Sequence, residues 1–195
     1  MKKWIFPIIL IAIAFWAYTN GKGFYNEAVQ LREDASKQWS KVESAYQRRL
    51  DLIPNLVSTV KGYASHEKET LEGVIKARAE ATKTTINAGD LTPEKMAAFQ
   101  KAQSGLSGAL SKLMVVVEKY PDLKANQNFL ELQSQLEGTE NRIKVERDRF
   151  NDEVGDYRKF LESFPNNIFN MLFKFEEMHY YEADAAAATA PKVEF

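Results

Sequence analysis

Cysteine is absent from this chain of 195 residues, and histidine occurs only twice. The lack of cysteine excludes disulfide bonds, thiolate catalysis, iron–sulfur clusters and lipid attachment through cysteine. The segment "HEKET" begins at His66 like the zinc-binding H-E-x-x-H helix, but Thr70 stands where the second histidine is required. One Glu-x-x-His pair, Glu176 with His179, falls short of the two that a di-iron bundle needs. We therefore predict no metal site and no cofactor.

An excess of charge of one sign is also missing, because 26 basic and 27 acidic residues leave a formal net charge of −1. A protein that binds nucleic acid normally carries a basic surface, so we expect no nucleic-acid partner. The sequence contains no phosphate-binding loop, dinucleotide fingerprint or nucleophile elbow. We therefore expect no catalytic residues and no enzymatic activity.

Glycine and proline are sparse, and no alternating β pattern occurs, so long helices are expected. A seven-residue repeat is present instead, and it begins after Gly23. Its positions are Tyr25, Arg32, Trp39, Tyr46, Ile53, Val60, Glu67, Val74 and Ala81, with Ala28, Ala35, Val42, Leu56, Tyr63 and Ala77 at the +3 offset. Such spacing is typical of the interior stripe of a helix in a bundle or coiled coil.

An apolar run from Trp4 to Tyr18 follows Lys2 and Lys3. One interpretation is a cleaved signal peptide with a small-x-small site at residues 12–14. We favour a retained transmembrane anchor, because cleavage there would leave aromatic side chains exposed at a new terminus. As a helix, residues 4–24 span about 30 Å, which matches the hydrocarbon core of a bilayer. The aromatic residues suited to the far interface are Trp16, Tyr18, Phe24 and Tyr25.

The flanking charges predict the orientation of this anchor. The amino terminus, Lys2 and Lys3 outweigh Lys22 on the other side. The positive-inside rule then keeps the N-terminus in the cytoplasm and places the rest of the chain on the extracytoplasmic side.

Pro54 lies within the repeat, in the stretch "QRRLDLIPNLVSTVKGYASHE". A proline inside a helix removes one backbone hydrogen bond. The apolar phase continues through it, so we predict one kinked helix from Tyr25 to about Asn87 rather than two separate helices. Pro54 bends this helix to fit its neighbours, or alternatively serves as a functional hinge.

Three further helical segments are expected. Thr92 caps a helix that begins at Pro93 and runs to about Lys119, and small residues within it (Ser104, Gly105, Gly108 and Ala109) would let a neighbouring helix approach closely. The next helix starts near Asp122 or Asn126 and ends at Pro165. Its repeat positions are Phe129, Leu136, Ile143, Phe150, Tyr157 and Phe164, with Leu132 and Phe160 at the +3 offset. A short fourth segment follows, "NNIFNMLFKFEEMHYYEA" over residues 166–183, and it is apolar on one side through Ile168, Phe169, Leu172, Phe173 and Phe175.

These segments predict an all-α protein in which an N-terminal transmembrane helix precedes an antiparallel up-and-down bundle of about four helices. The expected parts are an anchor (1–24), a helical bundle (25–182), and an Ala-rich linker with a C-terminal tail (183–195). Six positions in the stripes are polar: Arg32, Arg49, Glu67, Thr139, Glu146 and Glu153. Opposite charges on facing helices would pair across the bundle and fix its register. A position at the edge of the stripe and a ligand site are the alternatives.

The tail after the Ala-rich linker is a candidate interaction segment, through Pro191, Lys192, Val193 and Phe195. A partner domain that adds an extended C-terminus to a sheet edge would capture it. In the alternative interpretation, Val193 and Phe195 pack back on the bundle of the same chain.

Two long segments carry a family resemblance. "YNEAVQLREDASKQWSKVESAYQRRLDLIPNLVSTVKGYASHEKETLEGVIKARAEA" resembles the first signature of the LemA family of bacterial membrane proteins, and "LMVVVEKYPDLKANQNFLELQSQLEGTENRIKVERDRFNDEVGDYRKFLESFP" resembles the second. The ending "PKVEF" is similar to the usual tail of the family, while residues 89–104 and 185–190 follow no family pattern. The resemblance implies a transmembrane helix before a helical bundle. It implies no reaction, because the family has no agreed biochemical activity.

Family members often occur beside membrane metalloproteases or other envelope-stress proteins, which implies a partner of that kind. We therefore expect a single-pass interaction or scaffold protein of the bacterial envelope. Its contacts would be the membrane through residues 4–24, a protein partner such as an envelope membrane protease, and further copies of itself. The alternative is a lipid-interacting or membrane-remodelling protein. The apolar segment from Ile168 to Phe175 favours this alternative, although Glu176 and Glu177 beside it are acidic and a membrane-surface helix is usually basic.

Overall fold

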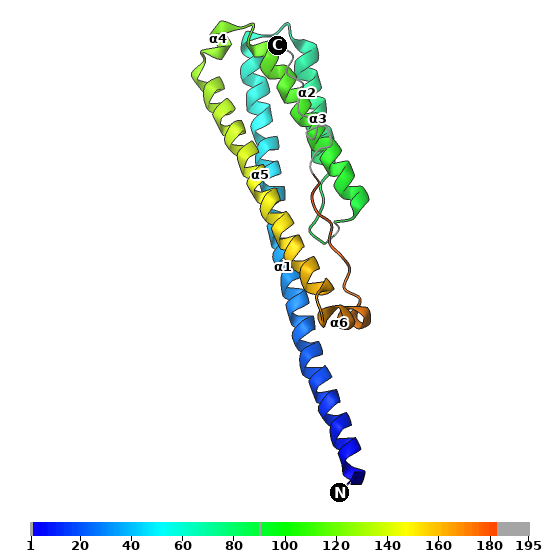
Figure 1. The fold of residues 1–195 in the computed structure, drawn as a ribbon. Coiled ribbons are helices and arrows are strands. Elements are labelled where there is room, and N and C mark those ends of the chain that lie inside the picture. Colours follow the sequence, from blue (N-terminus) through cyan, green and yellow to red (C-terminus); the bar gives the residue numbers. More distant parts are fainter. Residues whose placement is uncertain (1, 90, 183–195) are drawn as a thin grey trace, which may run out of the picture.

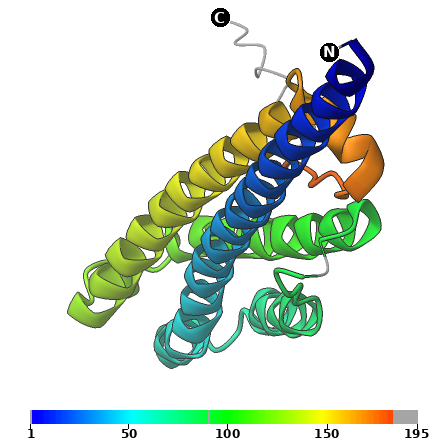
Figure 2. The same ribbon diagram turned by 90° about the horizontal axis from the view of Figure 1, so that it is seen from below.

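The computed structural model describes residues 2–89 and 91–182, and within them it shows six helices and no strand. The helices are α1 (Lys2–Tyr63), α2 (Lys68–Lys83), α3 (Pro93–Val117), α4 (Pro121–Lys124), α5 (Gln127–Glu162) and α6 (Asn166–Phe173). Helices α1, α2, α3 and α5 run alternately up and down, and α1 lies beside α5 in both ribbon views (Figures 1 and 2). The predicted all-α bundle is confirmed.

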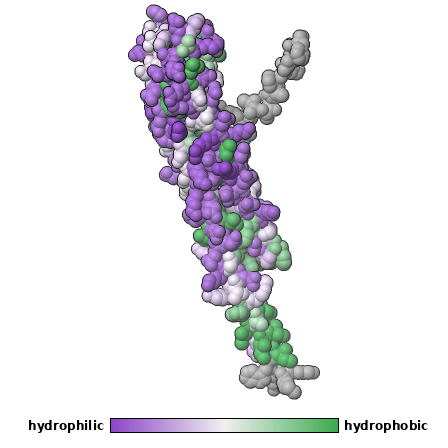
Figure 3. Space-filling view, turned by 90° about the vertical axis from the view of Figure 1, so that its left-hand side faces the viewer, coloured by the Kyte–Doolittle hydropathy of each residue, from purple (hydrophilic) through white to green (hydrophobic). Residues whose placement is uncertain are grey.

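Helix α1 is continuous over 62 residues, which is about 90 Å at ~1.5 Å per residue. Residues 5–20 are exposed except for the half-buried Pro7, whereas Gly21 and Phe24 are buried. By length and composition, this first part of α1 can cross a membrane. Its apolar surface forms one end of the molecule (Figure 3). The predicted boundary between anchor and bundle at residue 24 therefore lies inside an unbroken helix.

The predicted single helix from Tyr25 to about Asn87 is wrong, because α1 ends at Tyr63 and α2 begins at Lys68. The chain reverses over four residues that include Ser65 and His66, which are weaker helix formers than alanine or leucine. The repeat hides this reversal, because its positions on either side of the turn are buried in the same core.

Side chains of the residues that precede α4 and α5 hold this turn. The Tyr120 hydroxyl donates to Glu67 Oε1 at 3.0 Å, and Asn126 Nδ2 donates to the Tyr63 hydroxyl at 2.9 Å. The bond to the carboxylate raises the pKa of Tyr120 above its usual value. The turn is thus fixed by contacts distant in sequence, which no local pattern contains.

The predicted helix signals of α3 and α5 are confirmed. Thr92 Oγ1 accepts the amide of Lys95 at 3.4 Å, and Pro93 is the first residue of α3. Asn126 Oδ1 accepts the amide of Phe129 at 3.0 Å, which caps α5. Both helices end a few residues before a proline, as expected.

The buried side chains form two apolar cores. The aromatic core joins the first half of the bundle part of α1 to the end of α5, and it is centred on Phe24, Trp39, Tyr46, Phe99, Phe150 and Tyr157. The aliphatic core joins the second half of α1 to α2, α3, α4 and the start of α5, and it includes Leu50, Ile53, Leu56, Val60, Leu106 and Leu113. The boundary between them falls at the same height on α1, α3 and α5.

The predicted repeat is correct from Ala28 to Val60 except at Arg32, and it is wrong at Tyr25 and at Tyr63. Tyr25 is 48% exposed and Arg32 is exposed, whereas Phe24 is buried. Phe24 is therefore not an interfacial residue. Its ring stacks on that of Phe160 with the centroids 5.4 Å apart. Phe24 extends the buried stripe one turn before Ala28, because aromatic rings from the end of the described chain cover this side of α1.

Residues 174–182, named here the C-terminal strap, are not helical, which corrects the predicted fourth segment. Helix α6 ends at Phe173, where Lys174 adopts a left-handed φ of 54° and Asn170 Oδ1 accepts the amide of Phe175 at 3.0 Å. Side chains of α5 then bind the strap backbone. Asn151 both donates to and accepts from the main chain of Tyr181, at 3.0 and 2.7 Å.

Candidate functional site

A polar layer separates the two apolar cores. It consists of the buried side chains of Arg49 on α1, Gln103 on α3 and Thr139 on α5, together with Glu140. Of the six polar positions in the predicted stripes, Arg49, Thr139 and Glu146 are buried, Glu67 and Glu153 are half-buried, and Arg32 is exposed. The prediction of polar interior positions is therefore correct for three and wrong for Arg32.

Arg49 is the centre of this layer and is only 1% exposed. Its Nη1 donates to Glu140 Oε1 at 2.6 Å and to Ser107 Oγ at 3.1 Å, and its Nη2 donates to the side-chain oxygen of Gln103. One guanidinium thereby joins three helices. An ion pair across the bundle is present, but its acidic member is Glu140 of α5, which is not one of the predicted positions.

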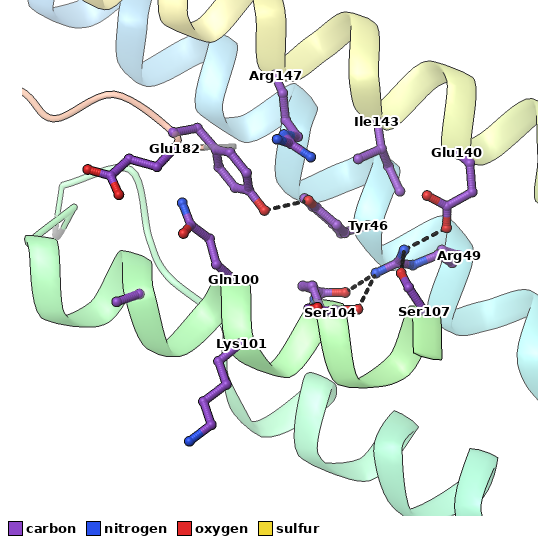
Figure 4. A pocket seen from close by; sticks show the side chains of 13 residues that line it. Tyr46, Arg49, Gln100, Lys101, Ser104, Ser107, Glu140, Ile143, Arg147 and Glu182 are labelled. Atoms are coloured by element: carbon purple, nitrogen blue, oxygen red, sulfur yellow. Dashed lines mark hydrogen bonds and ion pairs between the residues drawn. The ribbon is translucent and has the colours of Figure 1, made fainter. Parts of the chain in front are cut away.

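A pocket of about 460 Å³ opens beside this layer, between α1, α3, α5 and the C-terminal strap. Gln100 from α3 and Arg147 from α5 point into it from opposite sides, while Lys101 points away (Figure 4). Within the described residues, three buried side-chain donors lack a hydrogen-bond partner, namely Arg49 Nε, Gln100 Nε2 and Arg147 Nε. All three belong to residues that line this pocket.

Two tyrosines and two arginines form the wall of the pocket. The hydroxyls of Tyr46 and Tyr181 lie 2.9 Å apart and share a hydrogen bond. Arg147 lies over the Tyr181 ring at 3.9 Å, and Arg49 lies 5.1 Å from the centre of the Tyr46 ring. Burial, together with the nearby Tyr181 hydroxyl, raises the pKa of Tyr46 well above its usual 10.0, so this hydroxyl stays protonated at neutral pH.

The donors that line this pocket indicate the kind of ligand atom that it can bind. Its donors match the carbonyl, carboxylate or phosphate oxygens of a ligand, or water. The residues lining it include no histidine and no cysteine, so the usual pairing of a nucleophile with an imidazole base is missing there. Glu140 and Glu182 offset the charge of the arginines, which weakens attraction for a free anion.

A second buried polar contact lies inside the aromatic core. Gln38 Nε2 donates to Glu146 Oε2 at 2.8 Å and to the main-chain oxygen of Glu146 at 3.1 Å. Arg142 and Arg149 lie 3.7 Å from the same carboxylate. Glu146 thus pairs with cations on its own helix and with a neutral amide across the bundle.

Pro54 is an exposed residue within α1, and the helix continues through it as predicted. Because proline has no amide hydrogen, the main-chain oxygen of Leu50, four residues earlier, has no helical donor. Arg78 of α2 supplies one, since its Nε donates to the Leu50 oxygen at 2.9 Å. Pro54 therefore creates the acceptor through which α2 is attached to α1.

The other candidate residues are distributed as follows. Pro191, Lys192, Val193 and Phe195 lie outside the described residues. His66 and His179 are exposed and far apart in the chain. Glu176, which forms the Glu-x-x-His pair with His179, accepts the Tyr157 hydroxyl through its main-chain oxygen at 2.8 Å. Pro54 is thus the one interaction candidate that the structure places, and its neighbourhood is a helix contact.

Gly105 and Gly108 of α3 do not act as predicted. A Cβ added to Gly105 or Gly108 would meet no atom within 4 Å, so neither glycine is needed for a close approach. Both line a surface groove of about 990 Å³ between α2 and α3 that also includes Gly73 and Ala102. Ala109 differs, because it packs on the aliphatic core.

Sequence reasoning did not identify Gln38, Arg78, Gln103 or Glu140 as members of buried contacts. Gln103 carried a usable signal, since it lies three and seven residues before the buried Leu106 and Leu110. Glu140 carried none, because its side chain is 47% exposed and resembles any surface glutamate.

The model of the LemA family matches residues 38–195, which is most of the chain. The chain belongs to the LemA family. Its relatives include the magnetosome protein MamQ of Magnetospirillum gryphiswaldense, 28% identical over 182 residues, and magnetosome protein MamQ 2 of Paramagnetospirillum magneticum, 25% identical over 184. Protein LemA of Metamycoplasma hominis is 24% identical over 166 residues.

Each of these alignments covers 85% of this chain and 67% of the relative. The family match includes the polar layer, Pro54 and the C-terminal strap. Together with the exposed apolar start of α1, membership of the LemA family and these relatives support a membrane-associated helical protein.

Proposed function

We propose that this chain is a membrane-anchored interaction or scaffold protein of the bacterial envelope, with no catalytic site. The observation that carries the proposal is the continuity of α1. Its exposed apolar start and its buried bundle half belong to one helix without a break. A helix is stiff over this length, so the position of the anchor fixes the position of the bundle relative to the membrane.

The proposal includes the partners and the topology. The anchor is residues 4–24, and the bundle lies on the extracytoplasmic side, as the flanking lysines favour. The partners are a membrane protein of the envelope, such as a protease, and further copies of the chain, but not nucleic acid. The numbers of basic and acidic residues are nearly equal, so the protein has no strong electrostatic field of one sign. This supports binding through the shape of the surface rather than through long-range electrostatic attraction.

Site-specific photo-crosslinking in living cells tests this proposal. The crosslinker is placed singly at three exposed apolar positions on different helices, Ile75, Val115 and Val145, which are 52, 68 and 45% exposed. We expect a discrete adduct from one face and none from the others. An adduct of twice the chain mass identifies a homo-oligomer. No adduct from any face, or a stoichiometric transition metal in the purified protein, would count against a scaffold.

Two further variants sharpen the test. A chain lacking residues 191–195 keeps the adduct if the bundle binds the partner, and loses it if the tail is the docking segment. A single cysteine at Val115, in a chain that has no other cysteine, reports the topology. A membrane-impermeant maleimide labels it from outside the cell membrane if the bundle is extracytoplasmic.

A second candidate function, a lipid-interacting or membrane-remodelling protein, is favoured by one observation. Helix α6 exposes large apolar side chains, with Leu172 74% exposed and Met171 73% exposed. Both functions require the anchor, and they differ in what the bundle contacts next.

A further inference from the structure

Helix α6 is apolar on two sides, but only one side is packed against protein. Phe169 and Phe173 face α1, where their rings lie 5.9 and 5.8 Å from that of Phe24. The other side of α6 is open to solvent, and so is Phe164, two residues before the helix. This outer face consists of Phe164, Ile168, Met171 and Leu172, which are 81, 51, 73 and 74% exposed. Grouped exposure of this kind marks an interaction surface.

The outer face lies at the junction of the anchor and the bundle. The ring of Trp16 lies 6.4 Å from that of Phe169, and a Cβ at Gly21 would be 3.6 Å from the same ring. Figure 1 shows α6 crosswise to α1 at this height. In the space-filling view, further apolar areas lie above the apolar end of the molecule, separated from it by a paler band (Figure 3).

We propose that α6 lies in the interface of the bilayer that α1 crosses, with Phe164, Ile168, Met171 and Leu172 inserted among the headgroups and upper acyl chains. A helix crosswise to a membrane-spanning helix lies along the membrane plane, where an apolar face is buried by about 5–10 Å. This inference rests on the proposed membrane anchoring of α1.

Continuity with the anchor favours lipid over a protein as the occupant of this face. Along α1, the exposed apolar stretch ends at Tyr18, and burial in the bundle begins at Gly21. The α6 contact therefore falls where the helix passes from lipid to the bundle. A protein partner would have to enter the interface to reach this face, whereas lipid is already present there.

The charges near α6 determine which lipids it needs. Arg158 lies 3.6 Å from Glu162 and 3.4 Å from Glu177, so its charge is offset within the chain. The exposed Lys159 and Lys174 are balanced by the exposed Glu176 and by the second carboxylate near Arg158. Apolar burial rather than attraction to anionic lipid is thus the driving force. Zwitterionic vesicles suffice, and salt has little effect on the contact.

The test uses the full-length chain in vesicles of phosphatidylcholine. Because the chain has no cysteine, each introduced cysteine carries the only label. An environment-sensitive fluorophore is attached to Leu172→Cys on the outer face. A matched control is Val115→Cys, which is 68% exposed on α3 at the other end of the bundle. A second control is Ile11→Cys in the anchor, also 68% exposed. Quenching by aqueous iodide and by shallow doxyl-labelled lipid is measured for each.

The label at Leu172 is expected to show several-fold weaker iodide quenching than the label at Val115, and strong quenching by the shallow doxyl lipid. Equal iodide quenching at Leu172 and Val115 would overturn the inference. Protection from both quenchers would also overturn it, because it would indicate a protein or a second copy over the face. If iodide quenches the label at Ile11 as strongly as the label at Val115, the membrane anchor itself is wrong. If iodide reaches the label at Leu172 in this way but not the label at Ile11, the anchor stands and the α6 contact fails.

Discussion

The aromatic and aliphatic cores hold different kinds of structure. In the aromatic core, large side chains with a polar group fix segments that are not helical. Trp39 Nε1 donates to the main-chain oxygen of Ile86 at 2.8 Å, and the Tyr157 hydroxyl donates to that of Glu176 at 2.8 Å. In the aliphatic core, leucine, isoleucine and valine pack helix against helix by shape. Aromatic residues with a polar edge thus serve where loops must be held.

The comparison is tested most strongly by Trp39→Ala. Trp39 is fully buried, and its loss should cost about 3–5 kcal/mol of unfolding free energy. Leu113→Ala, an equally buried change in the aliphatic core, should cost about 2–5 kcal/mol. Denaturation of the full-length protein in detergent, followed by circular dichroism, measures both.

Hydrogen exchange separates the two variants even if their free energies are similar. Trp39→Ala should speed amide exchange in residues 84–89 and in the C-terminal strap, because their ring and hydrogen-bond contacts are lost. Leu113→Ala should leave these segments protected and affect α2 and α3. If residues 84–89 and the C-terminal strap exchange at the same rate in the two variants, the aromatic core does not hold these non-helical segments more than the aliphatic core does.

The boundary between the cores is tested by Glu140→Ala. The change leaves the buried guanidinium of Arg49 without its carboxylate, and we expect a loss of about 2–3 kcal/mol, near the low end for a broken buried pair because Glu140 is half-exposed. Glu137→Ala, one turn earlier on the exposed face of α5, should cost less than about 0.5 kcal/mol.

The paired replacement Arg49→Met with Glu140→Gln decides whether the ion pair stabilises the bundle or only fixes its register. Because apolar replacement of a buried ion pair is often neutral, the double variant should recover most of the stability lost in Glu140→Ala. A double variant as unstable as the single one would show that the polar layer itself holds the two cores together.

The sequence was sufficient to predict the fold wherever the signals are local. Thr92 and Asn126 cap their helices, Pro121 and Pro165 bound them, and the repeat along α5 is buried from Phe129 to Tyr157. Each of these features depends on neighbouring residues alone. The all-α class and the exposed apolar start of α1 could be predicted for the same reason.

The features that could not be predicted depend on contacts between distant residues. The turn after Tyr63 keeps the apolar repeat in phase, so the pattern contains no sign of it. The C-terminal strap has the composition of an amphipathic helix, yet hydrogen bonds from Asn151 and Tyr157 hold it in a non-helical conformation. In the polar layer, Arg49 was identified by its position in the stripe, whereas Glu140 became a partner only through the packing of α5 on α1.

The attachment of α2 to α1 is tested by Arg78→Ala. Its side chain supplies the donor that Pro54 withholds from the Leu50 oxygen, and its loss should cost about 1–2 kcal/mol. Lys76→Ala on the exposed side of α2 is the control, with an effect within about 0.5 kcal/mol. Both are measured by denaturation of the full-length protein.

A double-mutant cycle with Pro54→Ala shows whether the proline is the cause. Alanine restores the amide hydrogen to the helix, so the Leu50 oxygen regains its own donor. Arg78→Ala should then cost much less than it does beside Pro54. An unchanged cost would show that Arg78 acts through its packing, independently of the proline.

The smallest effect is expected from Tyr46→Phe, at the edge of the aromatic core. The change removes the hydrogen bond to Tyr181 and should cost about 1 kcal/mol at neutral pH. It should also alter the pH dependence of stability. Burial raises the pKa of Tyr46 in the folded protein above 10.0, the value in the unfolded chain. Above that pH the unfolded chain releases this proton while the folded protein keeps it, so stability falls as pH rises.

The contribution of Tyr46 is therefore complete below pH 10.0 and is lost above it. In the wild type, the unfolding free energy lost through this one group approaches about 1.4 kcal/mol per pH unit above pH 10.0. The variant Tyr46→Phe should lack this pH-dependent loss. Phe99→Leu is the control, because the Phe99 ring lies 4.9 Å from that of Tyr46 and carries no titratable group. It should lower stability at every pH without changing the slope. If Tyr46→Phe also leaves the slope unchanged, the Tyr46 hydroxyl is accessible to water, and the aromatic core is open on the side of the pocket.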